Sequence, residues 1–174
     1  MTYSLVSKRA FTLIELLVVI SIIAILASLA FPAVNGALDS AKKAQAKNAA
    51  VQIATAVTAY ETEYGRLPVT NATTVNKALM DVLTGIDTGS TNNPRGIVFM
   101  EVTEWRKGKG GTNSSGYCDP WGNTNAYQIA MDVNYTNEIT AGTNNTKLRK
   151  RVAVWNLPSG SASEQKRRYV TSWD

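Results

Sequence analysis

The sequence contains no histidine and only one cysteine, Cys118, in 174 residues. Histidine is the usual general base near neutral pH and the commonest protein ligand for metals, so its absence leaves catalysis poorly supported. A single cysteine excludes an internal disulfide and argues against a cysteine-based metal site. We therefore expect neither an enzyme nor a small secreted protein held together by disulfides.

Acidic residues are fewer than basic ones, 13 against 18, which gives a net charge of +5 and a pI near 9.4. This balance fits attraction to nucleic acid, anionic lipid or an acidic partner, although Lys8 and Arg9 supply two of the charges. No base-reading motif accompanies the three basic clusters, so we expect solvated surface and no nucleic-acid site. The clusters are Arg106-Lys107-Lys109, Lys147-Arg149-Lys150-Arg151 and Lys166-Arg167-Arg168.

The chain does have a long apolar run near its start, from Phe11 to Phe31. As a helix this run is about 31 Å long, which matches the hydrocarbon thickness of a bilayer. We therefore expect it to span a membrane. Its polar residues are Thr12, Glu15, Ser21 and Ser28.

The basic pair Lys8-Arg9 precedes the run, so the positive-inside rule keeps the amino terminus in the cytoplasm and sends the rest of the chain across the membrane. A secretory signal peptide is an alternative, but its apolar core is about 7 to 15 residues and its small-residue cleavage site follows the core. Here the run is longer, and the small residue Ala10 precedes it.

Glu15 is the one carboxylate inside the run. An unpaired ionised group there costs at least a few kcal/mol, so the residue predicts a partner. Cleavage before Phe11 would create an ammonium group that the Glu15 of a neighbouring helix could neutralise in a low-dielectric bundle. The alternative is an interfacial residue that is tolerated near the membrane face.

The segment Lys8-Arg9-Ala10-Phe11-Thr12-Leu13-Ile14-Glu15, with the apolar residues after it, resembles the class III signal of type IV pilins and type II secretion pseudopilins. The resemblance implies that a prepilin peptidase cuts between Ala10 and Phe11 and methylates the new amino terminus. Pro32 falls at the helix-kinking proline of that family. The residue before the cut is usually glycine there, and alanine is still small, so we expect processing at a lower rate.

After Pro32 the pattern becomes amphipathic and predicts that the helix continues to Tyr64, about 50 residues in all, with Gly65 as its C-cap. A bend or local melting is expected around Pro32 and Asn35-Gly36. The residues predicted to face a core are Ala37, Leu38, Ala41, Ala44, Ala50, Ile53, Ala54, Val57, Tyr60 and Tyr64.

The remainder predicts short elements with antiparallel connections. Residues 71–74 offer capping residues for a short second helix that closes at Thr84-Gly85. The glycine-rich stretch 106–116 predicts a mobile loop. Strands are predicted at Gly96–Val102, Ala126–Val133 and Leu148–Trp155.

Two later stretches resemble the major pseudopilin of type II secretion: Asp119-Pro120-Trp121-Gly122-Asn123 and the closing Val170-Thr171-Ser172-Trp173. In that protein the loop before the last tryptophan binds calcium. The corresponding residues 159–168 carry one acid and three cations, an unfavourable set for calcium. We therefore expect no metal or other cofactor, with Asp119 and Glu164 as the metal ligands considered.

Two further groups carry weak signals. Asp119, Asp132 and Glu138 could supply an acidic pair for hydrolysis, but nothing in their spacing requires one. Cys118 could be reactive, but no histidine is present to lower its pKa, so we expect a small buried residue.

We predict an α+β fold in which a long amino-terminal helix packs on a small antiparallel sheet domain, as in pilins. The expected parts are a leader at 1–10, a transmembrane and polymerisation helix at 11–32, and a globular domain at 33–174 whose amphipathic helix runs to about 64.

The preferred function is a structural subunit of a pseudopilus or pilus-like filament, anchored first in the bacterial inner membrane. Its partners would be further copies of itself, the prepilin peptidase, the inner-membrane assembly platform, minor pseudopilins and the lipid bilayer. The alternatives are a signal-anchored binding domain that never polymerises, and an adhesive or DNA-uptake pilin.

Overall fold

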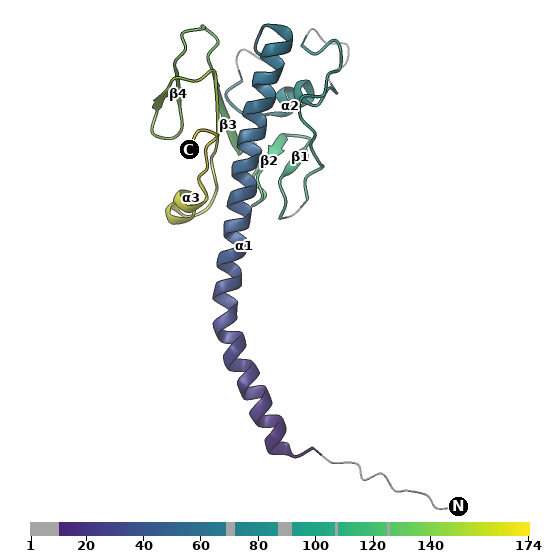
Figure 1. Cartoon of the computed structure of the whole chain (residues 1–174), viewed down its shortest axis with the longest axis vertical. Helices are drawn as coiled ribbons and strands as arrows, with labels where there is room; N and C mark the ends of the chain where they lie inside the picture. The colour runs from purple at the N-terminus through teal and green to yellow at the C-terminus, as the bar shows by residue number, and fades with distance from the viewer. Residues whose placement is uncertain (1–10, 69–71, 87–91, 107, 125) are drawn as a thin grey trace, which may run out of the picture. The chain divides into compact units, whose positions relative to one another are not determined.

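The computed structural model describes residues 11–68, 72–86, 92–106, 108–124 and 126–174. The chain divides into two units, one that ends at Asp39 and one that comprises Ser40–Asp174, and a single long helix contributes to both (Figure 1). The predicted α+β arrangement of a long helix with small antiparallel sheets is confirmed. The helices are α1 (Leu13–Tyr64), α2 (Lys77–Leu83) and α3 (Ala162–Arg168); the strands are β1 (Gly111–Asn113), β2 (Gly116–Cys118), β3 (Tyr127–Met131), β4 (Ile139–Ala141), β5 (Thr146–Leu148) and β6 (Val152–Asn156).

Helix α1 has 52 residues, in agreement with the predicted length. It ends at Gly65, whose φ is +66° and whose N–H donates to the Glu61 carbonyl at 2.8 Å. Glycine adopts this left-handed conformation without the steric cost of a Cβ, so the predicted C-cap is confirmed. Pro32 and Asn35-Gly36 lie inside the continuous helix, so the local melting expected there is not observed.

The face of α1 that covers a core begins at Ala46, later than the sequence pattern predicts. Ala37, Leu38, Ala41 and Ala44 are exposed, so their assignment to an internal core is wrong. The amphipathic pattern includes these four residues, but no helix or strand among the described residues covers them. The buried residues of α1 are Ala46, Ala49, Ala50, Ile53, Ala56, Val57 and Tyr60.

Helix α2 begins one turn later than the capping residues at 71–74 suggest. Its N-cap is Asn76, whose side chain accepts from the Leu79 N–H at 3.0 Å. The residues before it are extended and pair with β3: Val75 N–H donates to the Tyr127 carbonyl at 2.9 Å. The predicted close of the helix at Thr84 is confirmed.

Strands β3 and β6 form the central antiparallel ladder, with Ile129 opposite Val154. The predicted strand at 126–133 is thus confirmed. Isolated bridges extend the ladder on both edges, Thr74 to Gln128 on the β3 side and Thr171 to Trp155 on the β6 side. The carboxy-terminal segment is therefore part of the sheet.

The predicted strand at Leu148–Trp155 is divided in two. Its first residue closes β5, which pairs with β4 in a hairpin, and the strand β6 starts at Val152. The intervening Arg149, Lys150 and Arg151 form a bend. This bend of three basic residues connects the β4–β5 hairpin to β6 of the central ladder.

Two loop and strand predictions are wrong. Residues 111–118 form the hairpin β1–β2, with Asn113 opposite Gly116, where a mobile loop was expected. Gly96–Val102 forms no strand, because the N–H groups of Phe99 and Met100 both donate to the Leu83 carbonyl at the end of α2. The buried Asn93 side chain also forms two hydrogen bonds with the Ile97 backbone: its amide nitrogen donates to the Ile97 carbonyl, and its amide oxygen accepts from the Ile97 N–H.

The core of the Ser40–Asp174 unit lies between the later turns of α1, α2 and the central ladder. Tyr127 is fully buried, and its hydroxyl donates to the Ala46 carbonyl at 3.3 Å. The ring also packs edge-on against Tyr117 of β2, with centroids 5.5 Å apart. This tyrosine ties α1 to two of the three ladders.

Candidate functional site

The functional segment predicted from the sequence is the amino-terminal part of α1. Each residue from 11 to 38 is exposed, and Phe11 and Leu13 are 79% and 82% exposed. Residues 16–38 contain no charged side chain. Exposed apolar surface of this extent is not stable in water, so the segment requires lipid or other protein to cover it.

By length and composition α1 can cross a membrane. One window of 18 residues reaches a mean hydropathy of 2.8, and none of it is buried within the chain. The two serines of the apolar run are already satisfied, since Ser21 donates to the Leu17 carbonyl and Ser28 to the Ile25 carbonyl, each at 2.7 Å. The polar cost of placing this helix in lipid is therefore concentrated at its start.

Glu15 lies in the first turn of α1, where it forms a capping box with Thr12. One carboxylate oxygen, Oε2, accepts from the Thr12 N–H at 2.8 Å and from the Thr12 hydroxyl at 2.7 Å. The Thr12 hydroxyl in turn accepts from the Glu15 N–H at 3.2 Å. Such reciprocal bonds satisfy donors that would otherwise be orphaned at a helix start.

Within the part of the chain that the structure describes, the other Glu15 oxygen, Oε1, accepts no hydrogen bond. Oε1 is thus available to accept from a further donor, while Oε2 caps the start of the helix. The capping role of Thr12 was not predicted, although the spacing Thr-x-x-Glu ahead of an apolar run is a recognised signal. Of the other predicted site residues, Ala10 lies outside the described residues, and Pro32 lies within the helix.

Asp119 and Glu164, the two residues considered as calcium ligands, form hydrogen bonds and an ion pair within the chain. The Asp119 carboxylate accepts from the backbone N–H groups of Trp121 and Asn123, at 3.0 and 2.9 Å, and so fixes the turn after β2. Glu164 completes a capping box with Ser161 at the start of α3 and pairs with Arg168 at 2.9 Å. Helix α3 was not predicted, although its Ser-x-x-Glu spacing carries the signal.

Hydrogen bonds from Ser161, with the nearby Arg168 charge, lower the pKa of Glu164. Among the described residues, no group of three or more histidine, cysteine, aspartate or glutamate side chains could hold a metal ion. Calcium takes six to eight oxygen ligands, and these isolated carboxylates cannot supply them.

We therefore expect that calcium and chelator leave the stability of the folded chain unchanged. The measurement is thermal unfolding of the full chain in detergent, with about 1 mM calcium or with excess chelator, at a concentration that would saturate an extracellular calcium site. The midpoints should agree within error. A calcium-dependent rise in the midpoint that the variant Glu164→Gln abolishes would contradict this prediction.

The acidic residues weighed for hydrolysis do not form a pair with free carboxylates. Asp132 accepts from Thr136 and Asn137 N–H groups at 2.9 and 2.7 Å, and Glu138 pairs with Lys147 at 3.0 Å. Cys118 is fully buried, as predicted, and burial followed by the nearby Asp119 charge raises the pKa of its thiol.

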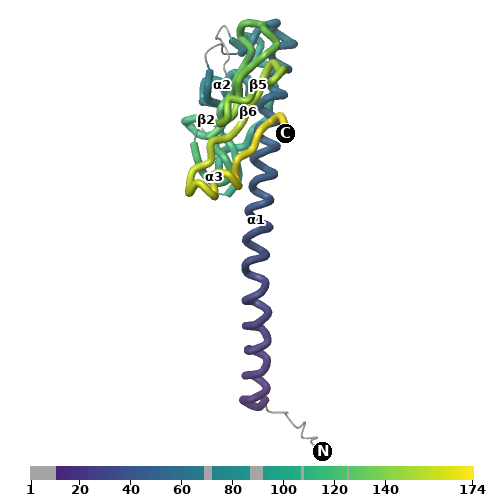
Figure 2. The backbone as a smooth tube through the Cα atoms, turned by 90° about the vertical axis from the view of Figure 1, so that its left-hand side faces the viewer, coloured from purple at the N-terminus to yellow at the C-terminus, as the bar shows by residue number. Residues whose placement is uncertain are grey.

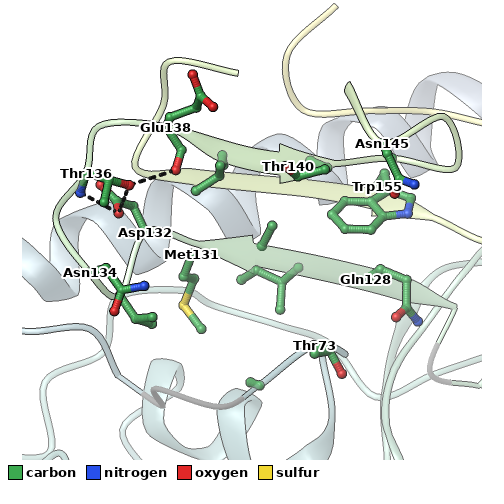
Figure 3. A pocket seen from close by; sticks show the side chains of 17 residues that line it. Thr73, Gln128, Met131, Asp132, Asn134, Thr136, Glu138, Thr140, Asn145 and Trp155 are labelled. Atoms are coloured by element: carbon green, nitrogen blue, oxygen red, sulfur yellow. Dashed lines mark hydrogen bonds between the residues drawn. The ribbon is translucent and has the colours of Figure 1, made fainter. Parts of the chain in front are cut away.

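A groove of about 690 Å³ opens between the central ladder and the β4–β5 hairpin. Figure 3 shows Met131, Gln128 and Trp155 along it, and the Thr136 bonds to Asp132 at one end. The carboxylates at that end are engaged within the chain. The groove therefore presents amide, hydroxyl and apolar surface and no acid–base pair.

Arg151 links three parts of the Ser40–Asp174 unit. Its guanidinium pairs with Glu61 of α1 and with Asp132, the latter at 2.9 Å, and lies 4.3 Å from the centre of the Tyr135 ring. The Asp132 side chain is only 1% exposed. Arg151, which was predicted to lie in a solvated basic cluster, therefore stabilises the fold through these contacts.

Residues 6–31 match the family model described as the prokaryotic N-terminal methylation motif. The match includes the basic pair, the expected cleavage position and the whole apolar run from Phe11 to Phe31. The chain therefore carries a prepilin-type amino terminus, and this motif implies processing by a prepilin peptidase. No curated protein and no solved structure gives a match to the chain. The motif and the exposed apolar helix together indicate a protein anchored in the inner membrane, in a class that is generally structural and not enzymatic.

Proposed function

We propose that this chain is a structural subunit of a type II secretion pseudopilus or a related pilus-like filament. The observation that carries the proposal is the run of exposed residues from 11 to 38, which lies within and just after a methylation motif. A plain anchor needs only lipid around such a helix. A carboxylate in its first turn with one oxygen free among the described residues favours a protein partner that brings a positive charge.

In this proposal the helix is stored in the inner membrane, cut between Ala10 and Phe11, and methylated at the new amine. Subunits then pack helix against helix, and apolar surface that faced lipid becomes buried between copies. Glu15 neutralises the Phe11 ammonium of a neighbour, and Pro32 gives the helix a point that can adjust during packing. An assembly platform with its own ATPase supplies the work of extraction, and minor pseudopilins complete the filament.

Mass spectrometry of the chain from its native membrane tests the processing step. We expect loss of residues 1–10 and a methylated Phe11, with the variant Ala10→Gly processed several-fold faster because glycine removes the remaining methyl group at the cut. An intact Met1, or an unmethylated cut elsewhere, would exclude prepilin processing.

Chemical cross-linking of sheared surface and periplasmic fractions tests the polymer. A ladder of multimers of the processed chain supports the filament. A processed chain found only as a monomer in the membrane fraction would instead support the anchored, non-polymerising alternative.

A further inference from the structure

The outer face of the central ladder, which points away from the main core, is covered only in part. Alternate residues of a strand face opposite sides of a sheet, so Ile129 of β3 lies in the main core while Ala130 and Ala153 point outward. These two alanines pack with Ile139 of β4 and Leu148 of β5 in a second, smaller cluster. Figure 2 shows β5 beside β6 in this part of the Ser40–Asp174 unit. The hairpin thus lies on the outer face, and the groove described above remains between it and the ladder.

A row of half-buried side chains crosses the strands at one end of this groove. Thr74 bridges to Gln128, which is opposite Trp155 in the β3–β6 register, and all three are half-buried. Side chains of residues that are opposite one another in adjacent strands lie on the same face of the sheet. The Trp155 ring packs edge-on against Trp173, with ring centroids 6.1 Å apart. The row therefore presents an amide next to an aromatic ring whose orientation is fixed by packing.

Asn145 brings a second amide to this row from the turn of the β4–β5 hairpin. Its φ is +51°, and its N–H donates to the Gly142 carbonyl at 3.3 Å. Asparagine is one of the few residues besides glycine that adopt this left-handed conformation readily. Figure 3 shows Asn145 beside Trp155, with Gln128 at the same end of the groove. The turn geometry thus places an amide over the aromatic ring.

The polar groups at this end of the groove are largely unused within the described part of the chain. The Gln128 Oε1 accepts from the Thr74 hydroxyl at 3.4 Å, but the amide nitrogen of Gln128 makes no hydrogen bond. The same holds for the Asn145 amide and for the indole N–H of Trp155. Amides offer both donors and acceptors, so this end can bond a ligand that carries both. Two threonine hydroxyls of the groove lining are also without a hydrogen bond among the described residues, those of Thr73 and Thr140.

Each carboxylate that lines the groove is paired with a cation. Asp132 pairs with Arg151 at 2.9 Å, and Glu138 pairs with Lys147 at 3.0 Å. Figure 3 shows both acids at the end of the groove away from Trp155. An ionic ligand would therefore meet no unpaired charge there, and the groove favours a neutral one.

An extended peptide is a poorer match, because such a peptide binds by adding a strand to an open sheet edge. Strand β3 pairs with β6 on one edge. On its other edge the Ile129 N–H donates to the Thr73 carbonyl at 2.9 Å. Strand β4 is three residues long and offers an added strand few backbone groups. Side chains, and not strand edges, are thus the main binding groups of the groove.

We propose that the end of the groove at Trp155 binds a neutral oligosaccharide. A sugar ring has an apolar face of C–H groups, which the indole can cover, and a rim of hydroxyls that donate and accept, which Gln128 and Asn145 can bond. The groove volume of about 690 Å³ lies within the range of about 300 to 1,000 Å³ that small-ligand sites occupy. The site is separate from the apolar helix, so the proposal adds a binding activity to the subunit and does not depend on filament assembly.

The test is saturation-transfer NMR on the full chain in lauryldimethylamine oxide micelles, a detergent without a sugar headgroup. The probes are maltotriose, cellotriose and triacetylchitotriose at about 5 mM, because weak binding of a small neutral ligand is expected. We expect transfer to the C–H protons of at least one trisaccharide. The variant Asn145→Gly should weaken its affinity by roughly tenfold, since glycine keeps the left-handed backbone and removes only the amide. Asn144→Ala is the matched control, because Asn144 lies in the same turn and does not line the groove.

Gln128→Thr provides a second variant that retains strand propensity, and its affinity should also fall several-fold. The thermal midpoint of each variant shows that it is folded. Absence of transfer to all three trisaccharides would overturn the proposal, and so would transfer that neither variant weakens. Transfer only to a blocked neutral peptide of alternating alanine and threonine, lost in both variants, would overturn it as well and assign the groove to polypeptide.

Discussion

Replacing Glu15 by alanine is expected to abolish filament assembly and leave the chain anchored in the membrane. In a packed bundle the ammonium group of a processed Phe11 would then be buried without a counter-charge, which costs several kcal/mol. We expect cross-linked multimers in sheared fractions to fall roughly 100-fold or more, since about 2.7 kcal/mol already corresponds to that factor. Loss of a carboxylate makes the apolar helix more compatible with lipid, so anchoring should persist.

The variant Glu15→Gln separates the two roles that the structure gives this side chain. Glutamine can still accept from Thr12 and so retain the capping box, but it carries no charge. If Glu15 acts by neutralising a neighbour's amine, both variants should fail to assemble. If Glu15 acts only by fixing the helix start, Glu15→Gln should assemble and Glu15→Ala should not.

Ser21→Ala is the matched control, because Ser21 is also a polar residue of the apolar run but donates only within its own helix. We expect its multimer ladder to match that of the unmodified chain. The mature amino terminus of each variant must be checked by mass spectrometry, since an uncut leader would itself prevent packing. Normal assembly of a processed Glu15→Ala chain would refute the charge-pairing mechanism.

The long amino-terminal helix could be predicted from sequence because its signals are local. A charge-free run of helical length, the glycine at Gly65 and the motif around Phe11 each act through neighbouring residues. The prediction failed at residues 37–44, where the amphipathic pattern predicts a buried face of the helix but that face is exposed in the structure. Periodicity indicates that a face will be covered and does not identify what covers it.

The globular unit was less predictable because its short strands depend on distant partners. The apolar stretch Gly96–Val102 has the composition of a strand, but its backbone donors are taken by Leu83 and Asn93. The glycines at 110 and 111 suggested mobility, whereas Gly111 pairs with Cys118 in a hairpin. These outcomes are decided by tertiary contacts, which override local propensity.

The candidate site was predicted in position and not in detail. Glu15 was recognised from its cost in lipid, but its bonds to Thr12 depend on side-chain geometry that spacing only suggests. Likewise the acid Glu164 was considered as a metal ligand, and the structure uses it to start α3. In both places a carboxylate three residues after a hydroxyl caps a helix, so this spacing should be weighed before a binding role is assigned.

Replacing Arg151 by alanine is expected to destabilise the globular unit by about 2 kcal/mol. The substitution removes the cation that pairs with both Glu61 and Asp132, and so leaves two partly buried carboxylates without this counter-charge. The loss affects contacts between α1 and the loop after β3, through Glu61 and Asp132. Denaturant unfolding of the full chain in detergent, followed by tryptophan fluorescence, measures the change. Arg149→Ala is the control, since Arg149 is exposed and within the described residues makes no ion pair, and it should remain within about 0.5 kcal/mol.

The pH dependence of the Arg151→Ala effect follows from Asp132. Burial disfavours its charged form, but hydrogen bonds from Thr136, Asn137 and Arg151 outweigh burial and lower the pKa of the carboxyl in the folded state. A lowered folded-state pKa means that the ionised group stabilises the fold above its ordinary pKa near 4, and that this stabilisation is lost as pH falls through the folded-state value. The stability gap between the unmodified chain and Arg151→Ala should thus be largest near neutral pH, and it should shrink as the pH falls below the ordinary aspartate pKa near 4 and through the lowered folded-state pKa of Asp132. A gap that stays constant from pH 7 to 3 would mean that Arg151 stabilises the unit through packing on Tyr135 and not through its ion pairs.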